Sequence, residues 1–310
     1  MVAIGVDLGG TIIKIGLVRN EQIIDFASVE ACPDADFTLS MARIESIVEG
    51  MIRRHDVTVL DGIAFGFAGQ VDFYGQKIRA TNGKYVSAEH IDLKKWVADK
   101  WHCRFFIDND ARIAAVGEWK YGAGRGFDNL VTMTIGTGIG TAVITEGRLI
   151  RGVHSQYGCL GGHITVNYNG RRCNCGNRGC VEAEAGSWSL PLIAKETDGY
   201  GTSAFSQAAT QDFRTLFSLA EQGDRFSRSL RDHCMDVWSA AVVSYIHAYD
   251  PEVVIIGGGV MKSSHVILPY MQAKINEHAW TPHGRVLLKA AEKCEHAAIL
   301  GAVYCLIHNI

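Results

Sequence analysis

One short stretch of the sequence places four candidate metal ligands close together. His163 is followed by Cys173, Cys175 and Cys180, and the carboxylate of Glu182 comes two residues later. Three cysteines and a histidine are a common closed set of ligands for structural zinc. The alternative is an ordinary glycine-rich loop, but thiols clustered in a chain without a secretory leader more often bind metal. We therefore expect zinc to shape this loop and to offer no open position for chemistry.

Glycine-rich turns between β-branched runs indicate a second kind of chemistry. The run at 2–8 is followed by Gly-Gly-Thr at 9–11, and strand character resumes over 12–18. The backbone N–H groups of such a hairpin can approach a phosphate closely. Asp7, at the end of the first strand, can hold Mg²⁺ through water. A plain hairpin turn uses the same residue types, so the motif supports phosphate binding mainly because it is repeated later in the chain.

The repeat lies at 130–144, where a strand, a turn through Gly136, Thr137 and Gly138, and another strand follow one another. Because strand character continues after Gly140, this turn is no dinucleotide fingerprint, which requires a helix there. A third cluster, 257–259, follows a run typical of a buried parallel strand. The order of the three clusters predicts a nucleotide held between two related halves.

The intervening segments predict helices and strands in alternation. Apolar periodicity indicates helices over 38–55, 93–101, 226–249 and 297–307, and strands over 61–69 and 104–108. This order implies a mixed sheet flanked by helices in each half. We expect a small N-terminal domain, 1–108 completed by 297–310, and a larger domain, 109–296, with a hinge near 108–111.

That junction contains a further group of candidate site residues, Asp108-Asn109-Asp110. A carboxylate between a strand end and a helix start can accept the proton of a bound hydroxyl as its oxygen attacks phosphorus. Asn109 can hydrogen-bond the same substrate. The alternative is that both aspartates only cap the helix that follows.

Composition describes an ordinary globular protein. The 310 residues suggest two domains, and the net charge of −3 gives no reason to expect nucleic acid or an anionic membrane as partner. Met1 leads directly into a strand pattern instead of a cleavable leader, and no apolar run is long enough for a membrane span. We expect a cytoplasmic protein. Six further cysteines are expected to be buried or free thiols: Cys32, Cys103, Cys159, Cys234, Cys294 and Cys305.

Taken together, these motifs resemble the ROK family of bacterial sugar kinases and repressors. The resemblance spans nearly the whole chain and rests on Asp7-Leu-Gly-Gly-Thr, Asn109-Asp110-Ala, Ile135-Gly-Thr-Gly-Ile-Gly, Gly162-His163, Cys-x-Cys-Gly-x-x-Gly-Cys-x-Glu at 173–182, and Ile256-Gly-Gly-Gly-Val. It implies the two-domain actin/hexokinase-like fold with ribonuclease H-like halves. It also implies ATP-dependent phosphorylation of a hexose, usually on its 6-hydroxyl, with Mg²⁺ and a structural Zn²⁺.

The resemblance also implies roles for individual residues. Asp110 is the general base, and the sugar contacts are Gly69, Asn82, Asn109, His163 and Glu182. His163 serves zinc through one ring nitrogen and can reach a sugar hydroxyl with the other. The ATP-binding residues are Asp7, Gly9, Gly10, Thr11, Lys14, Gly136, Thr137, Gly138, Gly140, Gly257, Gly258 and Gly259.

Two departures from the family pattern bear on the substrate. Leu160 stands three residues before His163, where family kinases commonly have a sugar-binding glutamate. A lost partner for a buried hydroxyl costs about 1–3 kcal/mol, so a hexose modified or epimerised around C1 to C3 is favoured over plain glucose. Arg112 replaces a common asparagine, either as a surface change or as a new contact near the cleft.

Two other functions of the family remain as alternatives. Its repressors add an N-terminal helix-turn-helix, for which the first strand at Val2 leaves no room, so DNA binding is not expected. A sugar-binding protein without catalysis would be expected to lose the base or the phosphate turns. The resemblance further implies a homo-oligomer, a dimer or a tetramer.

Overall fold

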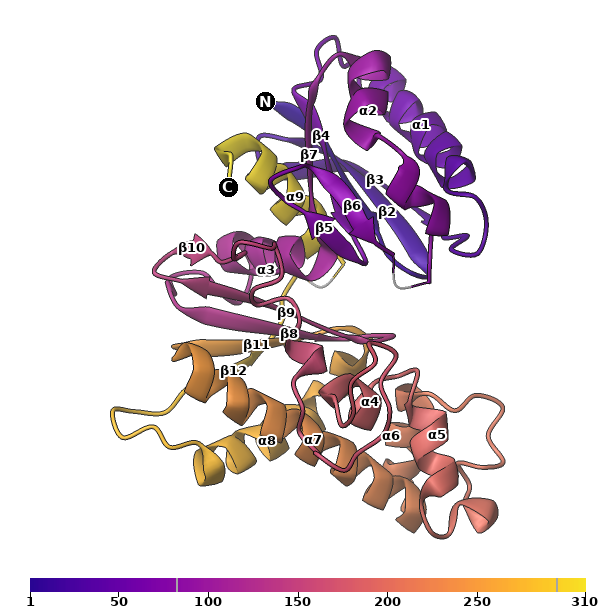
Figure 1. Ribbon diagram of the computed structural model, residues 1–310, viewed down its shortest axis with the longest axis vertical. Helices are drawn as coiled ribbons and strands as arrows, with labels where there is room; N and C mark the ends of the chain where they lie inside the picture. The colour runs from indigo at the N-terminus through magenta and orange to yellow at the C-terminus, as the bar shows by residue number, and fades with distance from the viewer. Residues whose placement is uncertain (82, 294) are drawn as a thin grey trace. The chain divides into compact units, whose positions relative to one another are not determined.

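The chain folds into two compact units of mixed α/β structure. The computed structural model describes residues 1–81, 83–293 and 295–310. The first unit comprises Met1–Gly126, Leu149–Cys159 and Glu292–Ile310, and the second comprises Phe127–Arg148 and Leu160–Ala291. Figure 1 shows the elements of both units along the chain.

A five-stranded sheet forms the first unit, in the order β3-β2-β1-β4-β7. β1 is antiparallel to β2 and parallel to β4, which is in turn parallel to β7. The strands are β1 (Val2–Leu8), β2 (Ile12–Arg19), β3 (Gln22–Glu30), β4 (Gly62–Phe67) and β7 (Arg104–Asn109), and a separate pair is formed by β5 (Gln70–Asp72) and β6 (Lys77–Ala80).

Helices cover both faces of this sheet because its strands are apolar on both faces. Ile4 and Val6 of β1 share a core with Val48 of the helix α1, whereas Gly5 lies against Ile299 of the C-terminal helix α9. α9 thus lies beside the N-terminal strands, as Figure 1 shows, and α3 packs against it. The helices are α1 (Phe37–Arg54), α2 (Leu93–Trp101), α3 (Asp110–Tyr121), α9 (Ala297–His308) and the 3₁₀ turn η1 (Val86–His90).

The second unit repeats the strand order of the first. Its sheet has the order β10-β9-β8-β11-β12, in which β8 is antiparallel to β9 and parallel to β11. The strands are β8 (Leu130–Ile135), β9 (Ile139–Thr145), β10 (Arg148–Leu149), β11 (Val253–Gly257) and β12 (Leu287–Ala290). The expected pair of related halves is therefore present, each with a central hairpin followed by parallel strands.

The core of the second unit lies between this sheet and the long helix α7. Trp238 and Tyr245 of α7 are fully buried against residues of β8 and β11, and Trp238 donates to the Ala185 carbonyl oxygen at 2.9 Å. The helices are α4 (Val181–Ala185), α5 (Leu190–Glu196), α6 (Phe213–Glu221), α7 (Arg225–Tyr249) and α8 (Ser264–His278), with the 3₁₀ turns η2 (Gly161–His163), η3 (Tyr200–Thr202) and η4 (Gly259–Ser263).

The division into units differs from the expected domains, 1–108 with 297–310 and 109–296. α3 and the segment Leu149–Cys159 belong to the first unit. The physical reason is that α3 packs against α9, which itself packs on the first sheet. Among the described helices, none is long and apolar enough to cross a membrane.

Candidate functional site

Asp110 stands where strand β7 ends and helix α3 begins. The helix is capped by Asn109, whose side chain accepts from the Arg112 N–H at 3.3 Å, so neither neighbouring aspartate is the cap. The Asn109 amide also donates to the Gly69 carbonyl oxygen at 3.1 Å and to Asp110 Oδ1 at 3.0 Å. The structure thus brings together three of the predicted site residues, while Asn82 lies outside the described residues.

The surroundings of Asp110 suit a general base. Burial raises the pKa of its carboxyl to about 7, and the negative charge of Asp7 adds to the rise. Backbone hydrogen bonds, including one from the Ala111 N–H at 2.8 Å, and the positive charge of Lys84 act in the opposite direction. A carboxyl that titrates near neutral pH is both ionised and basic enough to take a proton from a hydroxyl.

The first glycine-rich turn lies in the same unit, between β1 and β2. Asp7 and Lys14 are paired across these strands, and Lys14 Nζ lies 3.8 Å from Asp7 Oδ2. Burial raises the pKa of Asp7, and the charge of Lys14 partly offsets that rise. The charges of Asp7 and Asp110 also repel one another, and a hard divalent cation held by Asp7 would relieve this repulsion.

Two glycine clusters come together in the second unit. Gly257 pairs with Thr134 across β11 and β8. Gly258 has a φ of 99°, and a side chain there would collide with the carbonyl of Ile135, the residue that leads into the turn at 136–138. The third predicted nucleotide segment therefore lies directly beside the second.

Glu182 and Trp188 form hydrogen bonds at the turn at 136–138. Glu182 Oε2 accepts from the Ile139 N–H at 2.7 Å. Trp188 donates through Nε1 to Glu182 Oε1 at 3.0 Å and through its backbone N–H to the Thr137 carbonyl oxygen at 3.2 Å. The sequence did not single out Trp188, because 51 residues separate it from Thr137.

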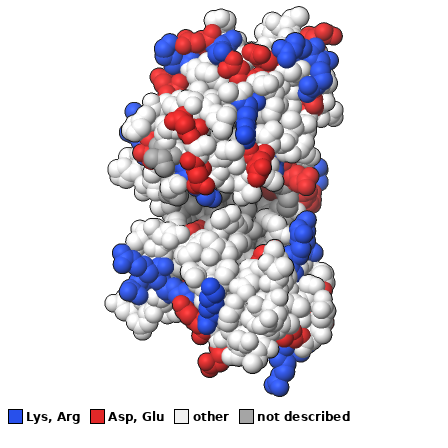
Figure 2. All heavy atoms as spheres, turned by 90° about the vertical axis from the view of Figure 1, so that its right-hand side faces the viewer, with Lys and Arg blue, Asp and Glu red and all other residues white. Residues whose placement is uncertain are grey.

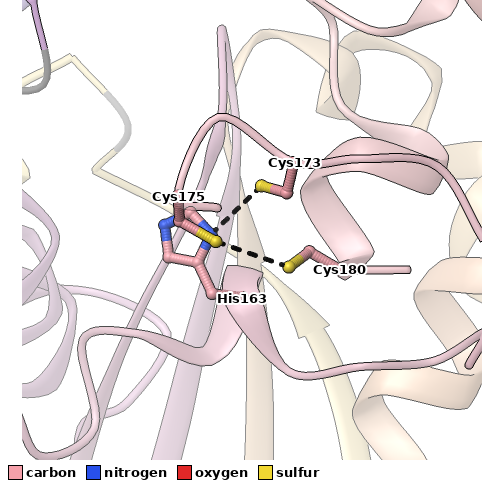
Figure 3. A group of neighbouring side chains, drawn as sticks. All are labelled: His163, Cys173, Cys175 and Cys180. Atoms are coloured by element: carbon pink, nitrogen blue, oxygen red, sulfur yellow. Dashed lines mark hydrogen bonds between the residues drawn. The ribbon is translucent and has the colours of Figure 1, made fainter. Parts of the chain in front are cut away.

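The four predicted metal ligands form one cluster, shown in Figure 3. Their ligand atoms all lie within 4.8 Å of one another. His163 Nδ1 is 3.6 Å from Cys173 Sγ, and Cys175 Sγ is 3.7 Å from Cys180 Sγ. Sulfur atoms bound tetrahedrally at about 2.3 Å from zinc lie about 3.8 Å apart, and a sulfur and a nitrogen lie about 3.5 Å apart. These two distances match the edges of a tetrahedral zinc site, so the cluster is compatible with zinc.

Substitution of one exposed ligand tests this cluster. Cys175→Ser is expected to reduce bound zinc from about one ion per chain to nearly none and to lower the melting temperature, because about 10 kcal/mol or more of loop ordering depends on the metal. Mass-spectrometric zinc content and a thermal melt measure both. Cys103→Ser, which changes a half-buried thiol outside the cluster, is the matched control. Equal zinc content in the two variants would contradict the assignment.

Arg112 is fully buried, so its interpretation as a surface change was wrong. Its Nη1 donates to Asp108 Oδ1 at 3.1 Å, and its Nη2 donates to the carbonyl oxygens of Ser155 and Tyr157 at 2.9 and 3.0 Å. Arg151 Nε donates to the other oxygen of Asp108 at 2.7 Å. Asp108 is therefore a structural anion between two arginines and is not available as a base.

Charges of both signs are mixed on the face drawn in Figure 2, where many Lys and Arg side chains lie near Asp or Glu. This distribution agrees with the net charge of −3. Nucleic-acid binding surfaces instead gather positive charge into a patch or stripe.

The comparisons with known proteins agree with these features. A family model described as "ROK family" matches residues 3–309. A glucokinase of Thermotoga maritima is 33% identical over 96% of this chain and 95% of its own length. The crystal structure of a ROK family glucokinase from Streptomyces griseus in complex with glucose and AMPPNP superposes with a TM-score of 0.81 at 25% identity, covering 99% of this chain and 100% of that one. A xylose repressor of Bacillus subtilis is 29% identical over 73% of this chain and 55% of its own length.

Proposed function

The chain belongs to the ROK family, and we propose that it is an ATP-dependent sugar kinase in which Asp110 is the general base. The observation that carries this assignment is the position of Asp110. It lies at a strand-to-helix junction and accepts a hydrogen bond from Asn109, and the pKa of its carboxyl is raised to about 7. The full-length match to glucokinases supports the reaction class.

The reaction divides among the described residues as follows. Asp110 accepts the proton of the acceptor hydroxyl while that oxygen attacks the γ-phosphorus of ATP. The backbone N–H groups of the two glycine-rich turns, at 9–11 and 136–138, bind phosphate oxygens. Mg²⁺ supplies positive charge to the phosphates when it is bound, and Asp7 is its candidate partner. Asn109 and Glu182 orient the sugar through hydrogen bonds.

The cysteine cluster has a structural part in this proposal. Cys180 directly precedes helix α4, and Glu182 lies in the first turn of that helix. His163 and the three cysteines would hold the zinc, which would fix the start of α4 and so the place of the Glu182 carboxylate. His163 Nδ1 faces Cys173, which leaves the other ring nitrogen for a sugar hydroxyl.

The acceptor is a hexose derivative in this proposal. Leu160 is half-buried, and its carbonyl oxygen accepts from the His163 N–H at 2.9 Å, so it lies next to a predicted sugar contact. Its side chain cannot accept a hydrogen bond from a sugar hydroxyl. A sugar with an apolar or altered substituent around C1 to C3 fits such a neighbour better than glucose does.

Trp188 provides a test of the Glu182 assignment. Trp188→Phe removes one hydrogen bond to a carboxylate, worth about 1.5–3 kcal/mol, so we expect the KM for the sugar to rise about tenfold or more. Steady-state kinetics at saturating ATP measure this change. Trp280→Phe changes an 83% exposed tryptophan of the same unit and serves as the control. An unchanged KM in Trp188→Phe would indicate that Glu182 does not contribute to sugar binding.

The function is tested by ATP turnover against hexoses, N-acetylhexosamines, aminohexoses, ketohexoses and cyclitols, with Asp110→Asn as the blank. One strong acceptor whose phosphorylation disappears in the blank would establish the kinase and its substrate class. The xylose repressor relative supports a second candidate, a sugar-binding protein without catalysis. Sugar binding by calorimetry, without turnover of any sugar that binds, would favour that candidate.

A further inference from the structure

Lys84 lies over the first glycine-rich turn, although no sequence motif singles it out. A methyl group built on Gly10 would collide with Lys84 Nζ and would lie 3.2 Å from its Cδ and Cε. The aliphatic stem therefore runs across the bare backbone of Gly10, and the ammonium group lies at the turn. Glycine at position 10 is what makes room for this lysine.

Tyr85 fixes Lys84 in this place. The Tyr85 hydroxyl donates to the Gly9 carbonyl oxygen at 2.9 Å, and its backbone N–H donates to the Pro33 carbonyl oxygen at 2.8 Å. The ring is fully buried and packs edge-on against Phe37, with centroids 5.4 Å apart. A buried residue bonded to Gly9 thus positions its neighbour Lys84 against Gly10.

The ammonium group of Lys84 has no ion-pair partner in the described part of the chain. Among the described residues, no acidic side chain lies within ion-pair distance of Lys84 Nζ, whereas the nearby Asp7 is paired with Lys14 at 3.8 Å. Lys84 is nonetheless close enough to Asp110 for its charge to lower the pKa of that carboxyl. The half-buried Lys84 thus places its ammonium group at a phosphate-type turn and within electrostatic reach of the candidate base.

We propose that Lys84 is a catalytic residue that donates hydrogen bonds from its ammonium group to the phosphoryl group during transfer. In that step the bond from the γ-phosphorus to the β–γ bridging oxygen breaks and the bond from the acceptor oxygen to phosphorus forms. The hydroxyl proton passes to Asp110, ADP leaves, and Lys84 keeps its protons. The inference rests on the proposed kinase function.

The physical basis of the proposed role of Lys84 is the charge that the phosphoryl group carries during transfer. Fixed donors aimed at developing charge are among the largest contributions to catalysis, and removing one costs about 10²–10³ in kcat. Phosphoryl transfer depends almost entirely on such positioning and charge stabilisation. The contact with Gly10 favours a phosphate of ATP over an anionic group of the acceptor as the partner of Lys84.

The kinetic test compares Lys84→Met and Lys84→Arg with Lys77→Met, which changes an exposed lysine of the same unit. Lys84→Met is expected to lower kcat about 100-fold or more with little change in the KM for the sugar, and Lys84→Arg to retain more activity. Tyr85→Phe, which loses only the hydroxyl bond to Gly9, is expected to lower kcat several-fold. An unchanged kcat in Lys84→Met, or a defect confined to the KM of an anionic acceptor, would overturn the proposal.

The pH dependence of kcat/KM provides a further measurement, which would not change if Lys84 had only a structural role. Asp110 is faced by Asp7, Lys84 and Cys159, and of these only Lys84 favours its ionised form. Removing that positive charge makes Asp110 hold its proton more tightly, so the acid limb of kcat/KM should move to higher pH in Lys84→Met. Lys84→Arg keeps the charge and should keep the limb in place.

Nucleotide binding separates this proposal from the kinase function itself. Calorimetry with Mg²⁺ and either AMPPNP or ADP requires no sugar turnover. We expect Lys84→Met to weaken AMPPNP binding about tenfold while ADP binding stays within about twofold. If AMPPNP binding is weakened in this way in a protein that phosphorylates no sugar, the phosphate contact is supported and the kinase function is rejected. Equal AMPPNP affinity in Lys84→Met and Lys77→Met would reject the contact.

Discussion

Asp110→Asn is expected to reduce kcat by about 10³-fold while sugar affinity stays within about one order of magnitude, because a general base acts on the transition state and contributes about 10²–10⁴. The substitution is nearly isosteric. An amide oxygen can still accept the hydrogen bonds that Asp110 Oδ1 accepts from Asn109 Nδ2 and from the Ala111 N–H. The local geometry should therefore persist while the basicity is lost.

The measurement is kcat with the best acceptor, together with calorimetric sugar binding. Asp99→Asn, at an exposed position of α2, is the matched control. In the unmodified protein kcat/KM should rise with pH through about 7, because burial and Asp7 raise the pKa of Asp110 to about 7 and only the ionised carboxylate can accept a proton. Near-normal turnover of Asp110→Asn, or a rate that does not change between pH 5.5 and about 8, would falsify the base assignment.

Features that depend on near neighbours in the chain could be predicted from the sequence. The Gly-Gly-Thr turn at 9–11 lies between two β-branched runs, and the structure has the expected hairpin of β1 and β2 there. The same holds for β8 and β9 around the turn at 136–138. The cluster of His163 and three cysteines was predictable because most of its members lie within one short loop, so that spacing alone limits where they can be.

Features that depend on distant segments could not be predicted in the same way. α3 follows the expected hinge in sequence, yet it belongs to the first unit because α9, almost 200 residues later, packs against it. Lys84 lies at Gly10 only because Tyr85 bonds to Gly9 across 76 residues. Such contacts leave no periodicity or spacing in the sequence, and an isolated lysine is usually an exposed surface residue.

Replacement of the buried Arg112 should strongly destabilise the first unit. Arg112→Met removes the guanidinium donor to the carbonyl oxygens of Ser155 and Tyr157 and one of the two arginine partners of Asp108. Breaking a buried pair by removing one member costs up to about 3–5 kcal/mol, and Arg151, which still donates to Asp108, offsets part of that cost. At about 2–4 °C per kcal/mol in a protein of this size, the melting temperature should fall by about 10 °C.

The surface pair Arg79 and Asp72 offers a matched comparison. Arg79 donates to Asp72 Oδ2 at 2.6 Å, a contact shorter than that of Arg112, but its side chain is 57% exposed. Exposed pairs contribute about 0–1 kcal/mol, so Arg79→Met should shift the melting temperature by no more than about 3 °C. Equal shifts in the two variants would show that burial does not decide the strength of the Arg112 pair.

A double-mutant cycle separates the charge pair from the packing around it. Arg112→Met and Asp108→Asn each remove the same Arg112–Asp108 bond, so the double variant should lose less stability than the sum of the single variants. Hydrogen exchange of 151–159 locates the effect, because Arg112 holds this segment through the carbonyl oxygens of Ser155 and Tyr157. Additive losses with unchanged exchange would show that Arg112 only fills space. Faster exchange confined to this segment would show that it ties Leu149–Cys159 to α3, the helix that begins with Asp110.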